Sequence, residues 1–452
     1  MTAILWLRRD LRRRDLPALG AAHADGAVVP VFVLDRLWEG AGAPRRAWLA
    51  ATLEATREAY DGHLTLRSGD PRQVLPALAR ELGARAVHVS RETTPAGRRR
   101  DTAVARALAA DGVAWVETGT PYAVGPGVLR NAQGGPFQVF TPFSRAWREH
   151  GWPGPAVEPA GLRLAGAEPD AAAWAEVRAA VGAEGVPELP GAGEEAALAR
   201  WDWFREEALE AYGELRDRPD LDAVSRLSPY LKLGVVHPRT LLAGIADRSG
   251  RGRARFEDEL AWREFYADVL VHNPSSLWCD LKPGLAGLAY DEPDTDAVAA
   301  WRQGRTGYPM VDAGMRQLLA EGWMHNRVRM VTASFLTKDL HVWWPVGARH
   351  FLEHLIDGDV ASNNHGWQWV AGTGTDAAPY FRVFNPVTQG LRFDPDGDYV
   401  RRWIPELRHL RGAAAHEPWK DPHGYERGYP ERIVDHAQER IAALERYERA
   451  RR

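Results

Sequence analysis

Two short apolar runs near the start of the chain, residues 3–7 (AILWL) and 28–34 (VVPVFVL), decide the fold class. Runs of this length, rich in branched apolar residues and bounded by polar ones, are typical of strands buried on both faces of a parallel sheet. Residues 84–90 and 113–116 predict two further strands of the same kind.

Amphipathic segments lie between these runs and predict helices over residues 45–60, 71–82 and 98–110. Strands that alternate with helices through short polar connections predict an α/β domain with a doubly wound parallel sheet. Neither a glycine-rich dinucleotide fingerprint nor a P-loop follows the first run, where LRRDLRRRD stands instead. We therefore do not expect nucleotide hydrolysis in this domain.

The composition changes after residue 130. Residues 131–190 are rich in Gly, Pro and Ala, which predicts a long connector over the surface. Within it, only residues 136–147 (PFQVFTPFSRAW) have enough aromatic side chains to pack as an anchored helix start. From residue 191 to 452, apolar residues recur at spacings of three and four, and Gly or Pro separates the segments. This part predicts an all-α domain.

The composition is that of a soluble globular protein, with 452 residues, 45% hydrophobic and 26% charged. No run of eighteen apolar residues occurs, so we expect no membrane span. Arginines follow the N-terminal apolar run, the wrong order for a signal peptide, so we expect a cytoplasmic protein. The single cysteine, Cys279, excludes an intrachain disulfide and a thiolate metal cluster. A net charge of −4 means that DNA binding would depend on a local basic patch, and 19 tryptophans suggest a stacking or photochemical role.

Residues 357–376 (DGDVASNNHGWQWVAGTGTD) combine carboxylates, carboxamides and indoles in one short segment. Asp357 and Asp359 can accept hydrogen bonds from ring N–H groups or pair with an arginine. The glycines allow a planar ligand to approach the backbone closely. The whole segment predicts a cofactor pocket, whereas either half alone is also typical of a polar turn before an aromatic core element.

Two other segments place mixed side chains on one helical face. Glu259, Trp262, Arg263 and Tyr266 fall at positions i, i+3, i+4 and i+7, which suits either a ligand pocket or a salt-bridged surface. The segment after residue 323 places Asn326, Arg329 and Met330 on one face in the same way, although a methionine there is more often part of a core.

Ser225 and Ser228 stand just before a predicted helix that has Pro229 in its first turn. Hydroxyl groups in this position cap the helix or hold a phosphate, and the motif alone leaves both interpretations open.

Six blocks in this order resemble the DNA photolyase/cryptochrome family: SRLSPYL, ELAWREFY, WRQGRTGYPMVDAGMRQL, GWMHNRVRMVTASFLTKDL, LIDGDVASNNHGWQW and GTGTDAAPYFRVFNP. Within the family they look like the microbial class I cyclobutane pyrimidine dimer photolyases, and RRDLRRRDLPAL resembles the N-terminal domain. The resemblance implies an α/β antenna-chromophore domain at 1–130, a connector at 131–190 and a helical FAD-binding and DNA-repair domain at 191–452.

The implied activity is light-driven repair of cyclobutane pyrimidine dimers, by electron transfer from excited reduced FAD to a flipped-out dimer. This is the reaction of a deoxyribodipyrimidine photolyase, a carbon–carbon lyase that requires no metal. The alternative is a blue-light-sensing cryptochrome without repair activity. Asn363 matches the position facing flavin N5, where the resemblance associates Asn with repair, and the chain ends in a predicted helix rather than a tail. His325-Asn326 lacks the second histidine of (6-4) photolyases.

The resemblance also assigns roles to single residues. Val224 departs from the usual threonine and so loses one hydroxyl contact. The FAD-binding residues are Tyr212, Val224, Ser225, Leu227, Ser228, Arg329, Asp357, Asp359 and Asn363. The dimer pocket is Glu259, Trp262, Asn326, Met330 and Trp369. We expect the contacts to DNA at Arg263, Tyr266, Arg382, Arg392 and Arg401.

For photoreduction, the resemblance implies a tryptophan chain through Trp367 and Trp344. Its third position falls at Asp291, and the sequence leaves Tyr290, Trp301 and Trp343 open as substitutes.

For the antenna, Arg46, Asp101 and Lys232 match positions of relatives that bind 8-hydroxy-5-deazaflavin, which we rank before an empty site and methenyltetrahydrofolate. The expected partner is UV-damaged double- or single-stranded DNA, bound by a monomer without an obligate protein partner.

Overall fold

The protein is described here from a computed structural model that covers residues 2–285, 287–375 and 381–451. The chain forms two compact units. Unit 1 consists of Met1–Glu210 and Ser225–Pro274, and unit 2 of Ala211–Val224 and Ser275–Arg452. Among the described helices, none has both the length and the apolar character that a bilayer span requires.

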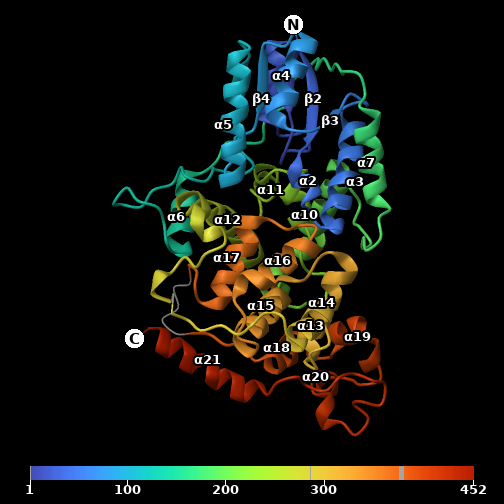
Figure 1. Cartoon of the computed structure of the whole chain (residues 1–452), viewed down its shortest axis with the longest axis vertical. Coiled ribbons are helices and arrows are strands. Elements are labelled where there is room, and N and C mark those ends of the chain that lie inside the picture. The colour runs from blue at the N-terminus through green and yellow to red at the C-terminus, as the bar shows by residue number, and fades with distance from the viewer. Residues whose placement is uncertain (1, 286, 376–380, 452) are drawn as a thin grey trace. The chain divides into compact units, whose positions relative to one another are not determined.

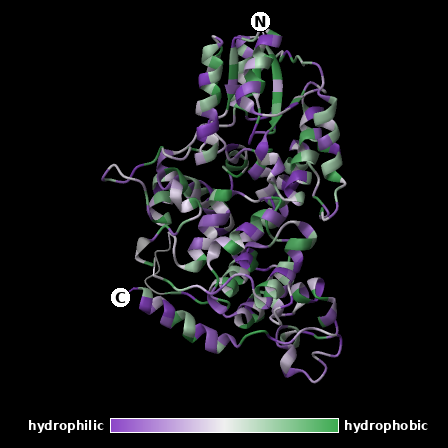
Figure 2. Ribbon diagram, in the orientation of Figure 1, coloured by the Kyte–Doolittle hydropathy of each residue, from purple (hydrophilic) through white to green (hydrophobic). Residues whose placement is uncertain are grey.

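A five-stranded parallel sheet with the order β3-β2-β1-β4-β5 organises unit 1 (Figure 1). Figure 2 shows that its long strands are mostly hydrophobic. The doubly wound parallel sheet predicted from the apolar runs is confirmed. Strand β3 was not predicted from the sequence, because it has only four residues (TLRS) and a single aliphatic side chain. The strands are β1 (Thr2–Trp6), β2 (Ala27–Leu34), β3 (Thr65–Ser68), β4 (Ala86–Val89) and β5 (Ala114–Glu117).

Helices cover the sheet as the alternation of the sequence predicts. Helices α4 and α5 pack beside each other and bury Leu75, Leu78, Val104 and Leu108 in one core with Val31 and other strand residues. Helix α1 packs against β1 and β4, and α3 packs against α7. The bounds are α1 (Pro17–Asp25), α2 (Arg36–Glu39), α3 (Ala43–Ala59), α4 (Pro71–Leu82) and α5 (Pro95–Ala110).

Residues 131–190 contain two helices, α6 (Phe140–His150) and α7 (Ala171–Val181). The first agrees with the aromatic segment that we expected to anchor a helix. Helix α7 was not predicted, because its sequence, AAAWAEVRAAV, has few large apolar residues. Its Trp174 and Val177 are nevertheless buried.

The remaining helices of unit 1 follow residue 190, and the longest is α12. They are α8 (Glu194–Trp203), a π-helical turn (Phe204–Ala208), α10 (Ser228–Leu233), α11 (Pro238–Gly244) and α12 (Arg251–His272).

Within its described residues, unit 2 is helical and has one large core. Tryptophan, methionine and aliphatic side chains from α13 to α17 form this core. The last helix, α21, alternates hydrophilic and hydrophobic residues along its length (Figure 2). The α-helices are α9 (Tyr212–Leu215), α13 (Asp296–Gln303), α14 (Pro309–Glu321), α15 (Asn326–Ser334), α16 (Trp344–His354), α17 (Val360–Ala371), α18 (Pro386–Phe393), α19 (Asp398–Trp403), α20 (Ala413–His416) and α21 (His436–Ala450). Short 3-10 turns lie at Pro274–Leu277, Pro283–Leu285, Pro405–Leu407 and Pro418–Lys420, and a π-helical turn at Phe335–Asp339.

Candidate functional site

Asp357 and Asp359, the two aspartates before α17 in unit 2, make different contacts. Asp359 caps α17, because its Oδ1 accepts hydrogen bonds from the N–H groups of Ala361 and Ser362 at 3.0 and 3.1 Å. Asp357 pairs with Arg329, whose Nη2 lies 2.8 Å from Asp357 Oδ2. The Asp357 carboxylate is only 2% exposed, so this is a buried ion pair at the start of the segment.

The first turns of α17 hold their polar side chains in fixed positions. Asn363 donates from Nδ2 to the carbonyl of Ala348 at 3.1 Å and to Asn364 Oδ1 at 2.9 Å. His365 is fully buried, with Nδ1 2.8 Å from the carbonyl of Ala361 and Nε2 2.9 Å from the Ser276 hydroxyl. Burial lowers the pKa of His365, so the ring is neutral at pH 7 and serves to position the helix.

Trp367 and Trp369 are two residues apart on α17 and therefore point in different directions. Trp367 is 3% exposed and packs edge-on against Phe351, with 4.9 Å between the ring centroids. A Cβ added at Gly347 would lie 2.2 Å from the Trp367 ring, so only glycine fits there. The Trp369 ring is half-buried and lies under the guanidinium of Arg382, at 5.3 Å.

The indole N–H groups of this region have different surroundings. Among the described residues, Trp367 Nε1 is buried without a hydrogen-bond partner. In contrast, Trp344 Nε1 donates to Asp280 Oδ1 at 2.7 Å, and the neighbouring Trp343 donates to the same oxygen at 3.3 Å. Trp278 stacks parallel to Trp344, with the centroids 6.4 Å apart. The Asp280 carboxylate therefore accepts hydrogen bonds from two adjacent indoles.

The three aromatic residues that the sequence left open as chain ends are placed differently. Trp343 is 39% exposed and its ring lies 6.4 Å from that of Trp344. The ring centroid of Tyr290 lies 6.4 Å from that of Trp343, and burial raises the pKa of the Tyr290 phenol. Trp301 has no exposed surface, and its ring centroid lies 6.2 Å from that of Trp367. Asp291 forms an exposed ion pair with Arg446 at 2.8 Å.

In unit 1, helix α12 carries the predicted face of Glu259, Trp262, Arg263 and Tyr266. The Trp262 ring stacks on Phe140, with the centroids 3.8 Å apart and 7° between the planes. Tyr266 lies next to it, at 5.2 Å. This stacking fixes the orientation of the indole on the helix.

Arg263, on the same face, has local partners in unit 1. Its guanidinium donates to the carbonyl oxygens of Pro121 and Leu231, each at 3.0 Å, and lies 4.4 Å from the Tyr122 ring. These contacts join three segments of unit 1.

The serine segment before α10 is also in unit 1. Ser225 Oγ accepts a hydrogen bond from the N–H of Leu227 at 3.4 Å, and Arg200 Nε donates to the carbonyl of Ser225 at 3.0 Å. Ser228 is the first residue of α10. In unit 2, Tyr212 is buried at the start of α9 and Val224 ends the short 211–224 segment.

The predicted antenna residues all lie in unit 1. Asp101 is buried, and its carboxylate pairs with Arg8 and with Arg100. Arg46 lies on α3, and its Nε is buried without a hydrogen-bond partner among the described residues. Lys232 lies on α10. A donor on Arg46 suits an oxygen of a planar ligand, whereas Asp101 already has two arginine partners.

The other predicted residues lie in unit 2. Asn326 begins α15, and Met330 on the same helix packs against the core. Arg392 is exposed beside the Phe393 ring at 5.0 Å. Arg401 donates to the carbonyl oxygen of Asp396 at 2.7 Å.

Two family models match the chain: "DNA photolyase" over residues 3–160 and "FAD binding domain of DNA photolyase" over residues 256–449. The chain is 42% identical to a protein of Halobacterium salinarum and 42% identical to one of Streptomyces griseus, each named deoxyribodipyrimidine photo-lyase. Each comparison covers 99% of this chain and 99% of the relative. The chain belongs to the DNA photolyase/cryptochrome family.

Solved structures of the family agree with this assignment. A bacterial class III photolyase from Agrobacterium tumefaciens has a TM-score of 0.88 at 36% identity. The match covers 99% of this chain and 97% of that structure's chain. A cryptochrome of Synechocystis sp. has a TM-score of 0.86 at 28% identity, and covers 98% of each chain. The shared fold alone does not separate repair from signalling, so that distinction depends on the sequence relatives and the site.

The residues present in unit 2 fit a flavin. The Asp357–Arg329 pair and the amide of Asn363 on α17 offer both acceptors and donors, which the N–H and carbonyl edge of a flavin ring requires. The sequence interpretation missed Asp280, because a single aspartate in a loop after Trp278 and Cys279 carries no periodic signal. Only the folded chain brings its carboxylate to Trp344, 64 positions away.

Proposed function

We propose that this chain is a cyclobutane pyrimidine dimer photolyase of class I. The observation that carries the activity is similarity over the whole chain, at 42% identity, to proteins named deoxyribodipyrimidine photo-lyase. The class I assignment rests on the sequence blocks, and the structural relative titled class III makes it a question for experiment. That the protein acts as a cytoplasmic monomer, without an obligate protein partner, stays a prediction.

FAD, when bound and reduced, supplies the excited electron that splits the cyclobutane ring of the dimer. The residues that we assign to holding the flavin ring are Arg329, Asp357, Asp359 and Asn363, all in unit 2. For the phosphates and sugar we assign Tyr212 and Val224 of unit 2, and Ser225, Leu227 and Ser228 of unit 1. Asn363 is held by Ala348 and Asn364, so its amide has a defined orientation.

The dimer contacts that we assign to unit 1 are Glu259 and Trp262 on α12. Trp262 is pre-oriented by Phe140, so a base that stacks on it meets a rigid surface. Glu259 lies one turn before Trp262, where a protonated carboxyl group can donate a hydrogen bond to a thymine carbonyl while negative charge develops on that oxygen. In unit 2 we assign Asn326, Met330 and Trp369 to the same task.

For the phosphates of DNA, Arg382 and Arg392 are the stronger proposals. Arg263 and Arg401 donate to carbonyl oxygens of their own units, which indicates a positioning role, and Tyr266 packs against Trp262. Arg382 lies above Trp369, so it places a cation next to an indole that we assign to the lesion.

We further propose that photoreduction runs through Trp367, Trp344 and Trp343. Trp367 would give an electron to the photoexcited oxidised flavin, Trp344 would then give one to Trp367 and Trp343 one to Trp344, so the positive charge would end on Trp343. Trp367 has no acceptor for its buried N–H among the described residues and therefore keeps its proton. Asp280 bonds to both outer indoles, and its negative charge stabilises the positive charge there. Trp343 is 39% exposed. We propose it as the last electron donor of the chain, in place of the tryptophan expected at position 291.

For the antenna, we propose 8-hydroxy-5-deazaflavin, with an empty site second and methenyltetrahydrofolate third. Arg46 supports the proposal because its buried Nε is available to an acceptor. The absorption spectrum of the purified protein tests this choice, since FAD, folate and deazaflavin absorb at different wavelengths.

The activity is tested by illuminating the chemically reduced protein with an oligonucleotide that contains one thymine dimer. We expect loss of the dimer under blue light and none in the dark. Flavin binding without loss of dimers would overturn the proposal in favour of a cryptochrome. The same assay with a (6-4) photoproduct should show no repair, because Asn326 stands where a second histidine would be required.

A further inference from the structure

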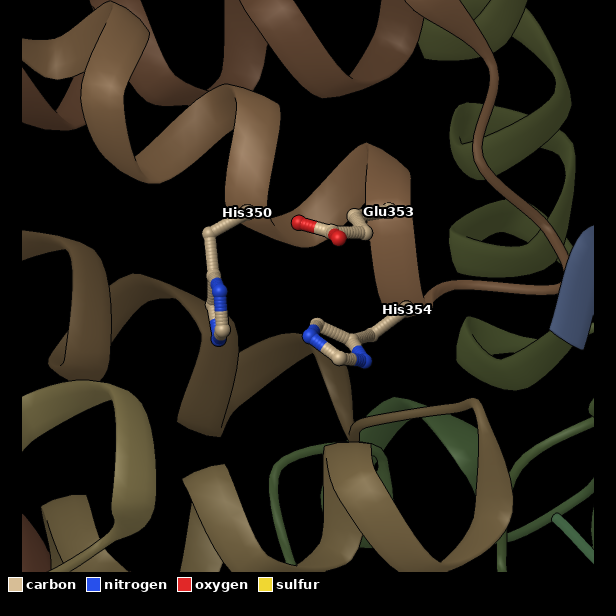
Figure 3. Close-up of side chains that lie close together, drawn as sticks. All are labelled: His350, Glu353 and His354. Carbon is tan, nitrogen blue, oxygen red and sulfur yellow. The ribbon is translucent and has the colours of Figure 1, made fainter. Parts of the chain in front are cut away.

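The last turns of α16 bring together two imidazoles and a carboxylate. His350, Glu353 and His354 stand at positions i, i+3 and i+4, and one ligand atom of each lies within 4.8 Å of the others. In Figure 3 the carboxylate of Glu353 and the ring of His354 both point toward His350. We propose that this cluster binds one divalent transition-metal ion of the zinc type.

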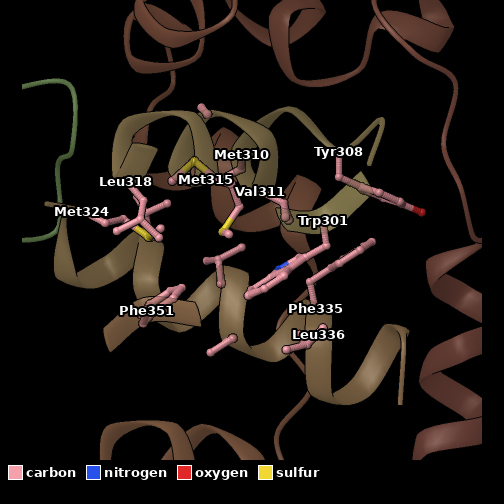
Figure 4. Packing of buried hydrophobic residues seen from close by; sticks show 14 of the residues in the cluster. Trp301, Tyr308, Met310, Val311, Met315, Leu318, Met324, Phe335, Leu336 and Phe351 are labelled. Carbon is pink, nitrogen blue, oxygen red and sulfur yellow. The ribbon is translucent and has the colours of Figure 1, made fainter. Parts of the chain in front are cut away.

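The burial of His350 is the first argument for a ligand. Its side chain is 8% exposed, and its Nε2 is buried without a hydrogen-bond partner among the described residues. The ring lies between Trp301 at 5.4 Å and His354 at 4.5 Å, measured between centroids. Trp301 belongs to the packed core of unit 2 (Figure 4), so the His350 ring packs against this core. A buried nitrogen lone pair without a donor is the state that a metal ion satisfies.

The carboxylate of the cluster also suits a metal. Glu353 is exposed and forms no ion pair within the described ranges, so its charge remains available to offset that of the ion.

The donor set indicates the class of metal. Two histidines and one glutamate, with the fourth position open to water, form a tetrahedral zinc site. In the known zinc-binding pattern His-x-x-Glu-His, the two histidines are the metal ligands. Imidazole ligands favour Zn²⁺, Co²⁺, Ni²⁺ and Cu²⁺ over Mg²⁺ and Ca²⁺. Metal–nitrogen bonds of about 2.0 Å place tetrahedral ligand atoms about 3.3 Å apart. Rotation of the exposed Glu353 and the half-buried His354 side chains would bring their ligand atoms to this distance.

All three ligands come from one helix, so the ion holds the C-terminal end of α16. This end lies three residues before Asp357. The site is separate from the residues assigned to flavin and DNA, and the inference does not depend on the proposed repair activity.

The test uses the full-length protein without a histidine tag, stripped with a chelator and then titrated with Co²⁺ or Zn²⁺. We expect one ion per chain by calorimetry and by metal analysis, and intense visible absorption of tetrahedral Co²⁺. His354→Gln should weaken binding by at least about tenfold, the loss that even outer-shell partners of a metal site cause. Glu353→Gln changes an exposed side chain and should weaken binding less.

His423→Gln is the matched control. His423 pairs with Glu426 at i, i+3 on the surface, and this pair belongs to no group of three possible ligands among the described residues. This variant should bind the ion as the unmodified protein does. Flavin content and circular dichroism report whether each variant is folded. The inference is overturned if the unmodified protein binds no stoichiometric ion, or if His354→Gln and Glu353→Gln both bind as tightly as His423→Gln.

Discussion

Two regions of the molecule combine a carboxylate with indoles, and they do so in different ways. On α12, Glu259 and Trp262 stand on one helix, and the indole is held by stacking on Phe140. At the start of α16, Asp280 comes from a loop and bonds to the N–H groups of Trp343 and Trp344. We propose that the first arrangement presents an acid and a ring to the dimer, and that the second stabilises charge on the rings themselves. We infer that repair and photoreduction use separate residues and can be abolished separately.

The largest effect is expected for Trp344→Phe. Phenylalanine keeps the packing but is much harder to oxidise, so photoreduction of the oxidised flavin should slow by about 100-fold, equivalent to about 2.7 kcal/mol of barrier. Repair by the chemically reduced variant should be unchanged. Transient absorption and a dimer assay measure the two reactions on the same sample. A loss of both would mean that the regions are not separate.

Glu259→Ala should have the opposite profile. A hydrogen bond to a charged group contributes about 1.5–3 kcal/mol, so removing the carboxyl group that donates to the charged dimer should lower the repair yield by about tenfold. Flavin content and the rate of photoreduction should stay the same. The repair yield per absorbed photon is the measurement. A yield equal to that of the unmodified protein would remove Glu259 from the dimer site.

Asp280→Asn sharpens the comparison, because asparagine retains an acceptor for both indoles and removes only the charge. A charge pair in partly exposed surroundings is worth on the order of 1 kcal/mol, so photoreduction should slow about three- to tenfold. Leu281→Asn at the adjacent position is the control for local disturbance. If the rate follows the control, the charge of Asp280 has no role.

The smallest effect is expected for Arg382→Gln. Loss of one phosphate contact should weaken binding of dimer-containing DNA by a few-fold and lower the slope of affinity against salt by about one. Arg401→Gln is the comparison, because Arg401 donates to backbone carbonyls of its own unit. Fluorescence anisotropy at several salt concentrations distinguishes them. Equal slopes for both variants would show that Arg382 does not contact a phosphate.

Much of the fold could be predicted from local pattern. The run at residues 28–34 is apolar at almost every position, so it had to be a strand covered on both faces. The role of Asp359 as a helix cap is also local, because its partners are two and three residues away. Helix α7 could not be predicted in this way, because its alanine-rich sequence is stabilised by packing against α3.

The sequence by itself determined the family, the parallel sheet and the segment 357–369, because each is a contiguous pattern with strong local preferences. It also contains the spacing of His350, Glu353 and His354, which one helix places together. Tertiary structure alone decided that Asp280 meets Trp344 and that His350 is buried against Trp301, 49 positions away. Contacts at this separation depend on how helices pack, and no local pattern encodes them.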